Sequence, residues 1–150
     1  MKVILIIIIA SILLAIAALS VLGYMSQSGR ANGLVEGRLT QCPDTPNCVC
    51  SEFAADAAHY IGPLVISSDD TAQIMGRLKS IIREMGGSIE QERDNYLAAT
   101  FTSAIFRFVD DLEIRIDLEN NLIHLRSASR VGRSDGGVNR QRIDRVKKSY

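Results

Sequence analysis

An α+β fold is predicted for most of this 150-residue chain, on three observations. One segment has apolar residues at helical spacing, and the segments after it alternate with the period of two that is typical of strands. A glycine-broken loop then leads into a second helical segment. We expect an N-terminal transmembrane helix, a tether, and one domain at residues 42–150. That domain would have an antiparallel sheet of about four strands with two helices packed on one face.

The transmembrane helix is predicted at residues 1–23. Residues 3–22 carry no charge, and a helix of this length spans about 30 Å, the thickness of the hydrocarbon core. The alternative is a cleaved signal peptide, whose apolar part is usually about 7–15 residues and ends at a small-residue site. The apolar run is longer here, and Gly23-Tyr24-Met25 is a poor cleavage site. We therefore expect an uncleaved, single-pass anchor that contacts the lipid bilayer through residues 3–22.

The residues that flank this helix bear on its orientation. Lys2 precedes it and Arg30 and Arg38 follow it, so the positive-inside rule nearly balances and favours a cytoplasmic N-terminus by little. We expect that orientation in an inner membrane, with the domain in the periplasm or outside the cell. Residues 24–41 contain Gly, Ser, Gln and Asn and few apolar residues, and they are predicted to form a tether between membrane and domain.

The segment from Cys42 to Cys50, with the sequence CPDTPNCVC, opens the domain as a stiff turn. A Cys42–Cys48 disulfide would stabilise it by about 2.4 kcal/mol in the chain-entropy model and requires an oxidising compartment. A metal site would instead use the three cysteines and His59, although the spacing is not that of common zinc sites. Three reduced cysteines in a cytosolic domain are the third interpretation.

The first helix of the domain is predicted behind the capping residues Ser68-Asp69-Asp70-Thr71. Gly86-Gly87 is expected to end it. One apolar stripe at helical spacing comprises Ile74, Leu78, Ile81, Ile82 and Met85.

Four strands are predicted at residues 88–93, 96–102, 105–118 and 122–129. In the third, apolar residues from Leu112 onward alternate with Glu113, Arg115 and Asp117, which indicates one buried face and one face in water. Glu119-Asn120-Asn121 suits a hairpin turn, because asparagine tolerates positive φ.

Two polar features of this scaffold are candidate catalytic groups. His59, next to Tyr60, is a candidate base or a hydrogen-bonded structural residue. Asp110 and Asp111 would serve general acid–base chemistry or a cation, or they form a turn or bulge at the end of a strand.

The loop at residues 127–142 has more polar chemistry than a connection requires. It precedes a helix predicted at residues 138–150, which Ser134 or Asp135 would cap. Glycines and a helix N-terminus can bind an anion, with arginines adding forked hydrogen bonds. Alternatively, Asp135 pairs with Arg130 or Arg140 in a structural corner. The candidate binding residues are Arg130, Arg133, Ser134, Asp135, Asn139, Arg140 and Arg142.

Charge is unevenly distributed although the net charge is zero. Residues 1–125 hold nine Lys and Arg against fifteen Asp and Glu, a balance of −6, whereas residues 126–150 hold eight against two, a balance of +6. This asymmetry favours an anionic partner for the C-terminal part. The zero net charge gives no reason to expect a nucleic acid, and no cofactor is expected.

The chain resembles the DUF1499 family of domains of unknown function over about residues 40–148. The resemblance is carried by CPDTPNCV at residues 42–49, HYI at 59–61 with PL at 63–64, VDD at 109–111, and RSASRVG at 126–132 with SD at 134–135 and VNR at 138–140. It implies a domain of bacteria and plastid-bearing eukaryotes that is often exported or behind a membrane segment. It implies no reaction.

Two positions depart from the family pattern. Serine is more frequent where Cys50 stands, which implies that Cys42 pairs with Cys48 and that Cys50 is incidental. A bulky apolar residue is more frequent where Gly136 stands, which implies a looser loop here.

Three functional hypotheses follow. In the first, a non-catalytic module contacts an anionic ligand, a lipid headgroup or a protein partner through residues 127–142. In the second, a hydrolase-like enzyme uses Asp135, His59 or Asp110 as its base on an anionic substrate. In the third, a thiol-redox or metal protein acts through Cys42, Cys48 and Cys50. Because no catalytic constellation is evident, we favour the non-catalytic module.

Overall fold

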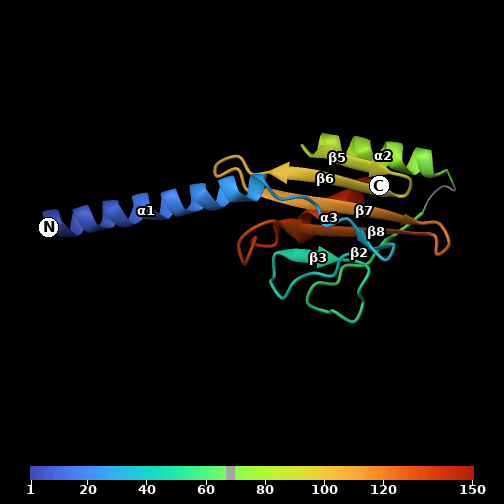
Figure 1. Cartoon of the computed structure of the whole chain (residues 1–150), viewed down its shortest axis with the longest axis horizontal. Helices are drawn as coiled ribbons and strands as arrows, with labels where there is room; N and C mark the ends of the chain where they lie inside the picture. The colour runs from blue at the N-terminus through green and yellow to red at the C-terminus, as the bar shows by residue number, and fades with distance from the viewer. Residues whose placement is uncertain (67–69) are drawn as a thin grey trace.

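A computed structural model describes residues 1–66 and 70–150 (Figure 1). Helix α1 (Lys2–Gln27) projects from one end of an α+β domain, which confirms the predicted fold class. The elements of the domain are, in order, β1 (Leu34–Val35), β2 (Arg38–Leu39), β3 (Cys48–Cys50), β4 (Leu64–Val65), α2 (Thr71–Glu84), β5 (Ser88–Arg93), β6 (Tyr96–Thr102), β7 (Val109–Asp117), β8 (Leu122–Ser129) and α3 (Val138–Ser149).

The main sheet is antiparallel and has the order β3-β8-β7-β6-β5, with β4 also paired to β8. Among the described residues it therefore has six strands, and not about four. The two additional strands, β3 and β4, are too short to show a periodic pattern in the sequence. Strands β5, β6 and β8 have the predicted bounds, whereas the strand predicted from residue 105 begins at Val109, after a loop. Strands β1 and β2 form a separate two-stranded sheet.

Helices α2 and α3 pack on one face of the main sheet and form the larger core with it, as predicted. Asp70 caps α2 by accepting hydrogen bonds from the backbone of Ala72 and Gln73. The other expected capping residues, Ser68 and Asp69, lie outside the described residues. The expected stop at Gly86 is confirmed by its φ of 85°. The core residues are Val49, Ile61, Ile74, Met75, Leu78, Ile82, Leu97, Ala99, Leu112, Ile114, Ile116, Ile123, Leu125, Ile143 and Val146.

The opposite face of the sheet is also covered, so the expectation that this face lies in water is wrong. Glu113, which points to it from β7, is 0% exposed. Its carboxylate accepts hydrogen bonds from Arg126 Nη1 at 2.7 Å, Tyr96 Oη at 2.8 Å and the Gly33 backbone at 2.8 Å. A carboxylate can be buried only when such partners replace its water. Part of the replacement comes from the segment before β1, which no local pattern in β7 reveals.

A second buried cluster on this face is centred on Glu52. Its carboxylate accepts from Arg115 Nε at 2.7 Å and from Arg38 Nε at 2.9 Å. Burial raises the pKa of Glu52, but the hydrogen bonds from Arg115 and Arg38 outweigh burial and hold the pKa below its usual value. Arg115 also pairs with Asp117, at 3.1 Å. Arg115 and Glu113 of β7 thus bind the segments around Gly33 and Glu52, which cover this face, to the sheet.

The end of α1 is packed directly on the domain. The helix continues past the boundary expected at Gly23 to Gln27, and Ser26 is 1% exposed. The Val109 backbone N–H donates to Ser26 Oγ at 3.1 Å, and Arg130 Nη1 donates to the Ser26 carbonyl at 3.2 Å. Residues 28–39, within the predicted tether, then run back along the sheet, where Leu39 is buried (Figure 1).

Candidate functional site

The loop between β8 and α3 is fastened to the cysteine-containing turn through Asn139. This side chain is 1% exposed and lies in the first turn of α3. Its Nδ2 donates to the Asn47 carbonyl at 2.9 Å and to Ser129 Oγ at 3.0 Å, and its Oδ1 accepts from Ser127 Oγ at 2.6 Å. In return, Asn47 Nδ2 donates to the Gly132 carbonyl at 2.9 Å. These bonds join two segments that are far apart in the sequence into one surface.

Asp135 binds backbone amides at the start of helix α3, although the N-cap residue itself is Gly137 and not Ser134 or Asp135. One carboxylate oxygen accepts from the Gly137 backbone at 2.9 Å and the other from the Asn139 backbone at 2.7 Å. Gly136 and Gly137 have φ values of 64° and 83°, a conformation that favours glycine, and they bring these amides round to the carboxylate. The anion at the positive end of α3 is therefore a side chain of the protein itself.

The arginines of the loop have different partners from those expected. Arg130 makes a forked ion pair with Asp111, with bonds of 2.9 and 2.7 Å. Arg142, which is buried, pairs with Asp110 at 2.7 Å. Neither arginine is paired with Asp135. The hydrogen bond to Asp111, more than any other effect, raises the pKa of Arg130.

The two consecutive aspartates of β7 face opposite sides of the sheet. Asp110 meets α3 on the face that the helices cover, and Asp111 meets Arg130 on the other face. Both belong to a ladder that pairs them with Ser129 and Ala128 without a register shift. They therefore form neither a two-carboxylate site nor a turn or bulge at the end of a strand.

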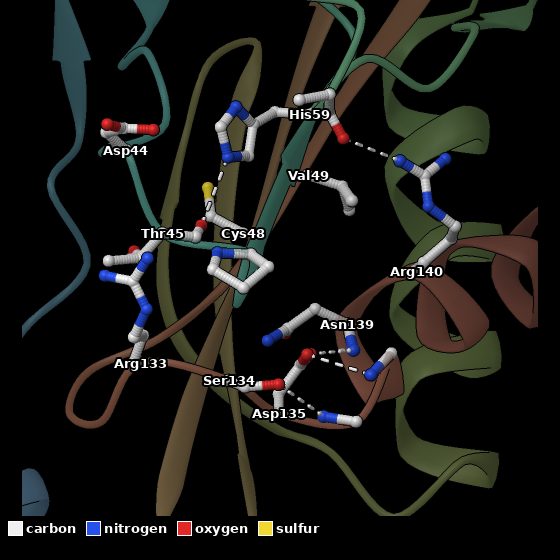
Figure 2. Close-up of a pocket in the computed structure, with 14 residues that line it drawn as sticks. Asp44, Thr45, Cys48, Val49, His59, Arg133, Ser134, Asp135, Asn139 and Arg140 are labelled. Carbon is white, nitrogen blue, oxygen red and sulfur yellow. Dashed lines mark hydrogen bonds between the residues drawn. The ribbon is translucent and has the colours of Figure 1, made fainter.

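A pocket of about 490 Å³ opens between the cysteine-containing turn and the loop (Figure 2). Arg133 and Arg140 lie on opposite sides of it, with His59 and Asp135 along its other edges. Arg140 donates to the carbonyls of Tyr60 at 3.2 Å and Ala58 at 3.4 Å and has no carboxylate partner within residues 1–66 and 70–150. The lining residues are Asp44, Thr45, Pro46, Cys48, Val49, Ala58, His59, Arg133, Ser134, Asp135, Gly136, Gly137, Asn139 and Arg140.

Arg133 differs from the other arginines of the loop. It is exposed, and among the described residues it has no hydrogen-bond or ion-pair partner. Nothing in the sequence distinguishes it from Arg130 or Arg140, since the distinction depends on which carboxylates β7 presents. Of the seven expected binding residues, the structure gathers Arg133, Ser134, Asp135, Asn139 and Arg140 around the pocket. Arg130 and Arg142 do not line it.

Both ring nitrogens of His59 are engaged. Nδ1 lies 2.9 Å from the Asp56 carboxylate, and Nε2 lies 3.1 Å from the Thr45 carbonyl. Each ring nitrogen is therefore within hydrogen-bond distance of a neighbouring group of the protein. A general base needs a free nitrogen that faces its substrate, and His59 does not offer one in this arrangement.

The pairing of the three cysteines is the one that the family resemblance implies. Cys42 and Cys48 form a disulfide, with Cα atoms 5.7 Å apart, and Cys50 is a free, buried thiol. Burial raises the pKa of the Cys50 thiol, which disfavours the reactive thiolate. The disulfide removes two of the ligands of the alternative metal site. No group of three or more His, Cys, Asp or Glu with metal-site geometry occurs in the part of the chain that the structure describes.

Buried polar residues that the sequence did not single out lie on the covered second face. Glu113 and Arg126 are cross-strand partners in the β7–β8 ladder. The turn predicted at residues 119–121 would have placed Glu113 opposite Ser127. The observed turn is one residue longer, because Asp117 pairs with Leu122, and this register brings the two opposite charges together. The partnership of Glu52 with Arg115 crosses from the segment after β3 to β7, and no local pattern indicates it.

Comparison with known proteins places the fold and this pocket in one family. Residues 38–149 match the model of a family described as protein of unknown function (DUF1499). The match includes the disulfide, the covered sheet and the loop that lines the pocket, and it begins after α1. No match to a curated protein or to a solved structure was found. The chain therefore belongs to the DUF1499 family.

Proposed function

We propose that this protein is a membrane-anchored binding domain. Helix α1 holds it on the outer side of an inner membrane, and the pocket between the cysteine-containing turn and the 133–140 loop recognises the phosphate or carboxylate group of a ligand. We infer an anionic ligand mainly from one observation: Arg133 borders the pocket and has no hydrogen-bond or ion-pair partner among the described residues (Figure 2).

The distribution of charge around the pocket supports an anionic ligand. The charge of Asp135 is engaged by the backbone amides at the start of α3, while Arg140 binds only carbonyl groups. Two guanidinium groups on opposite sides of the pocket thus have no counter-ion within residues 1–66 and 70–150. Forked donors of this kind suit phosphate and carboxylate oxygens. Asp44, also at the pocket, would favour a ligand that carries a donor beside its anionic group.

The anchor is supported by how α1 ends. The helix is long and apolar enough to cross a membrane, and its apolar side chains have no protein covering them. A signal sequence passes the same test of length and composition. Cleavage after the apolar run would, however, cut beside Ser26, whose bonds to Val109 and Arg130 belong to the folded domain.

The outer location is supported by the disulfide. Cys42 and Cys48 are bridged, and such bonds persist in oxidising compartments such as the periplasm or the cell exterior. With one membrane helix at the N-terminus, an outer domain requires the N-terminus to be cytoplasmic.

A thermal-shift comparison tests the pocket. The full chain in detergent would be melted with phosphate, pyrophosphate and citrate, as wild type, as Arg133→Ala and as Arg93→Ala. Arg93 is exposed on the edge strand β5, so Arg93→Ala removes the same charge at a site away from the pocket. A ligand that binds only the folded state raises the melting temperature, by an amount that grows with the ratio of its free concentration to its Kd.

We expect at least one of these anions to stabilise wild type and the Arg93 variant and to lose this effect in Arg133→Ala. An equal shift in all three proteins would mean that the anion binds elsewhere. Absence of a shift with every anion in the wild type would remove the support for an anion site.

A further inference from the structure

The loop between β6 and β7, residues 103–108, lies at the level where α1 leaves its apolar span. Gly23, the first residue after that span, packs on the loop so closely that a Cβ there would lie 1.8 Å from the Phe106 carbonyl oxygen. The next turn of α1 is joined to the first residue of β7 by the Ser26–Val109 hydrogen bond. These contacts fix the loop beside the helix at the boundary of the predicted hydrocarbon region.

The loop presents apolar surface that the described part of the protein leaves uncovered. Ile105, near its tip, is 82% exposed, and the neighbouring residues of α1, Tyr24 and Met25, are also exposed. Aromatic and apolar side chains that flank a membrane span are typical of the water–lipid boundary. Scattered exposed apolar residues need no explanation, but the 103–108 loop lies at the same end of the domain as the exit of α1 (Figure 1).

Two arginines at the same end complete the pattern. Arg107 in the loop and Arg30 after α1 are exposed, and neither has a hydrogen-bond or ion-pair partner among the described residues. Both line a polar pocket of about 600 Å³ between the exit of α1 and strands β5 and β6. Arginine binds phosphate oxygens with forked hydrogen bonds, and lipid phosphates lie just outside the hydrocarbon boundary.

We propose that the 103–108 loop is a second membrane contact, in which Ile105 enters the boundary between headgroups and acyl chains and Arg107, with Arg30, contacts lipid phosphates. This contact rests on the membrane anchorage proposed above and adds to it. It holds the domain in one orientation, with the Ile105 end towards the lipid and the β7–β8 turn away from it. A single helix with a free tether would impose no such orientation.

Tryptophan fluorescence tests this contact, because the chain contains no tryptophan. The full chain with Ile105→Trp would be reconstituted in phosphatidylcholine–phosphatidylserine vesicles with and without acyl chains brominated near the carbonyl end. We expect the emission of Ile105→Trp to be blue-shifted in ordinary lipid and to lose intensity in brominated lipid. Leu118→Trp is the matched control: it is 48% exposed in the turn at the other end of β7, about 27 Å away at 3.4 Å per residue. Its emission should stay that of a water-exposed indole.

A third variant, Leu14→Trp, separates this proposal from the anchorage itself. Because Leu14 lies near the middle of the predicted span, its probe is measured with acyl chains brominated near their methyl end. If the Leu14 probe is quenched and the Ile105 probe is not, the loop contact is wrong and the anchor stands. If neither probe is quenched, both proposals are wrong. Equal quenching at Ile105 and Leu118 would also overturn the oriented contact. Melting temperatures of the three variants would verify that each is folded.

The role of the arginine is tested in the Ile105→Trp protein. Adding Arg107→Ala should reduce the loss of emission, while adding Arg93→Ala should leave it unchanged. Repeating the measurement in pure phosphatidylcholine distinguishes attraction to net anionic lipid from contact with the phosphate that all these lipids share. Quenching that is the same with and without Arg107 in both vesicles would overturn the phosphate contact.

Discussion

Arg130 and Ser26 join the N-terminal helix α1 to the domain. The guanidinium of Arg130 donates to the Ser26 carbonyl at 3.2 Å, and a forked pair with Asp111 holds that guanidinium in place. The last turn of a helix leaves carbonyl groups without internal partners, and here a side chain of the domain satisfies one of them. The arginine is thus part of the connection between α1 and β7, which explains why it does not line the pocket.

The hydrogen bond from Val109 to Ser26 is expected to protect the Val109 amide from exchange with solvent. Ser26→Ala leaves this N–H without its acceptor, at a cost of about 1–3 kcal/mol for a buried group. We expect faster hydrogen exchange at Val109 in this variant, measured by mass spectrometry of peptides that span 103–112. Ser28→Ala is the control, since Ser28 is exposed and bonds only the Met25 carbonyl. Equal exchange in both variants would contradict the docking of α1.

Removal of the Glu113 carboxylate should leave Arg126 as an unpaired charge in the protein interior. We expect Glu113→Ala to lower the free energy of unfolding by about 3–5 kcal/mol, measured by denaturant titration. The exposed pair of Lys79 and Glu92 is the comparison, and Glu92→Ala should cost less than about 1 kcal/mol.

A double substitution tests the origin of that cost. If it comes from the unpaired arginine, Glu113→Leu combined with Arg126→Met should be more stable than Glu113→Ala alone. A double variant that is less stable than the single one would show that the pair itself, and not the unpaired charge, dominates.

Loss of the disulfide should destabilise the domain without unfolding it. The Cys42–Cys48 bridge closes a loop with a sequence separation of 6, for which the chain-entropy model gives about 2.4 kcal/mol. We expect the double change Cys42→Ala and Cys48→Ala to lower the unfolding free energy by about this amount. A reductant should lower the unfolding free energy of the wild type by a similar amount. Cys50 should resist thiol reagents until the domain unfolds, because it is buried. Rapid labelling of Cys50 in the native protein would contradict this placement.

The stability of the domain should fall in mild acid because of His124. Burial lowers the pKa of this imidazole, while Glu52 and Asp117, which raise it, and Arg115, which lowers it, have smaller effects. The folded state therefore favours the neutral ring. The contribution of the neutral His124 ring to the free energy of unfolding is fully present above the unfolded-state pKa, about 6.5. It is lost as the pH falls from there towards the folded-state pKa.

Melting temperatures at about pH 7.5 and about pH 5.5 would measure this effect in wild type and in His124→Gln. The drop between the two values of pH should be smaller in the variant. An identical drop would assign the acid sensitivity to other groups. Glu52, whose pKa is lowered in the folded state, becomes protonated only at lower pH. Its protonation there adds a separate decline in stability.

The helix-covered face of the sheet follows from local patterns in the sequence. The stripe from Ile74 to Ile82 and the apolar positions of β7 and β8 have the periods of a helix and of strands, so both elements and their buried sides could be predicted. The turn at Asn121, whose φ is 54°, was also recognisable from the tolerance of asparagine for that conformation.

The second face could not be predicted in the same way. Charged residues at every other position of a strand are typical of a face in water, and Glu113 is buried only because Arg126 and the backbone of Gly33 reach it. The last of these contacts joins residues separated by 80 positions. The same limit applies to the pocket. The position of Asp135 beside the start of α3 is local and could be predicted, whereas the partner of Arg130 depends on the neighbouring strand.

The central claim is that α1 remains part of the protein and holds the domain on a membrane. The most direct measurement is the intact mass of the chain recovered from the membranes of a bacterial expression host after an alkaline carbonate wash. We predict that the protein stays in the membrane pellet with the mass of the full chain, 16.4 kDa. A shorter species that begins near residue 24 or later and is released by the wash would contradict the account.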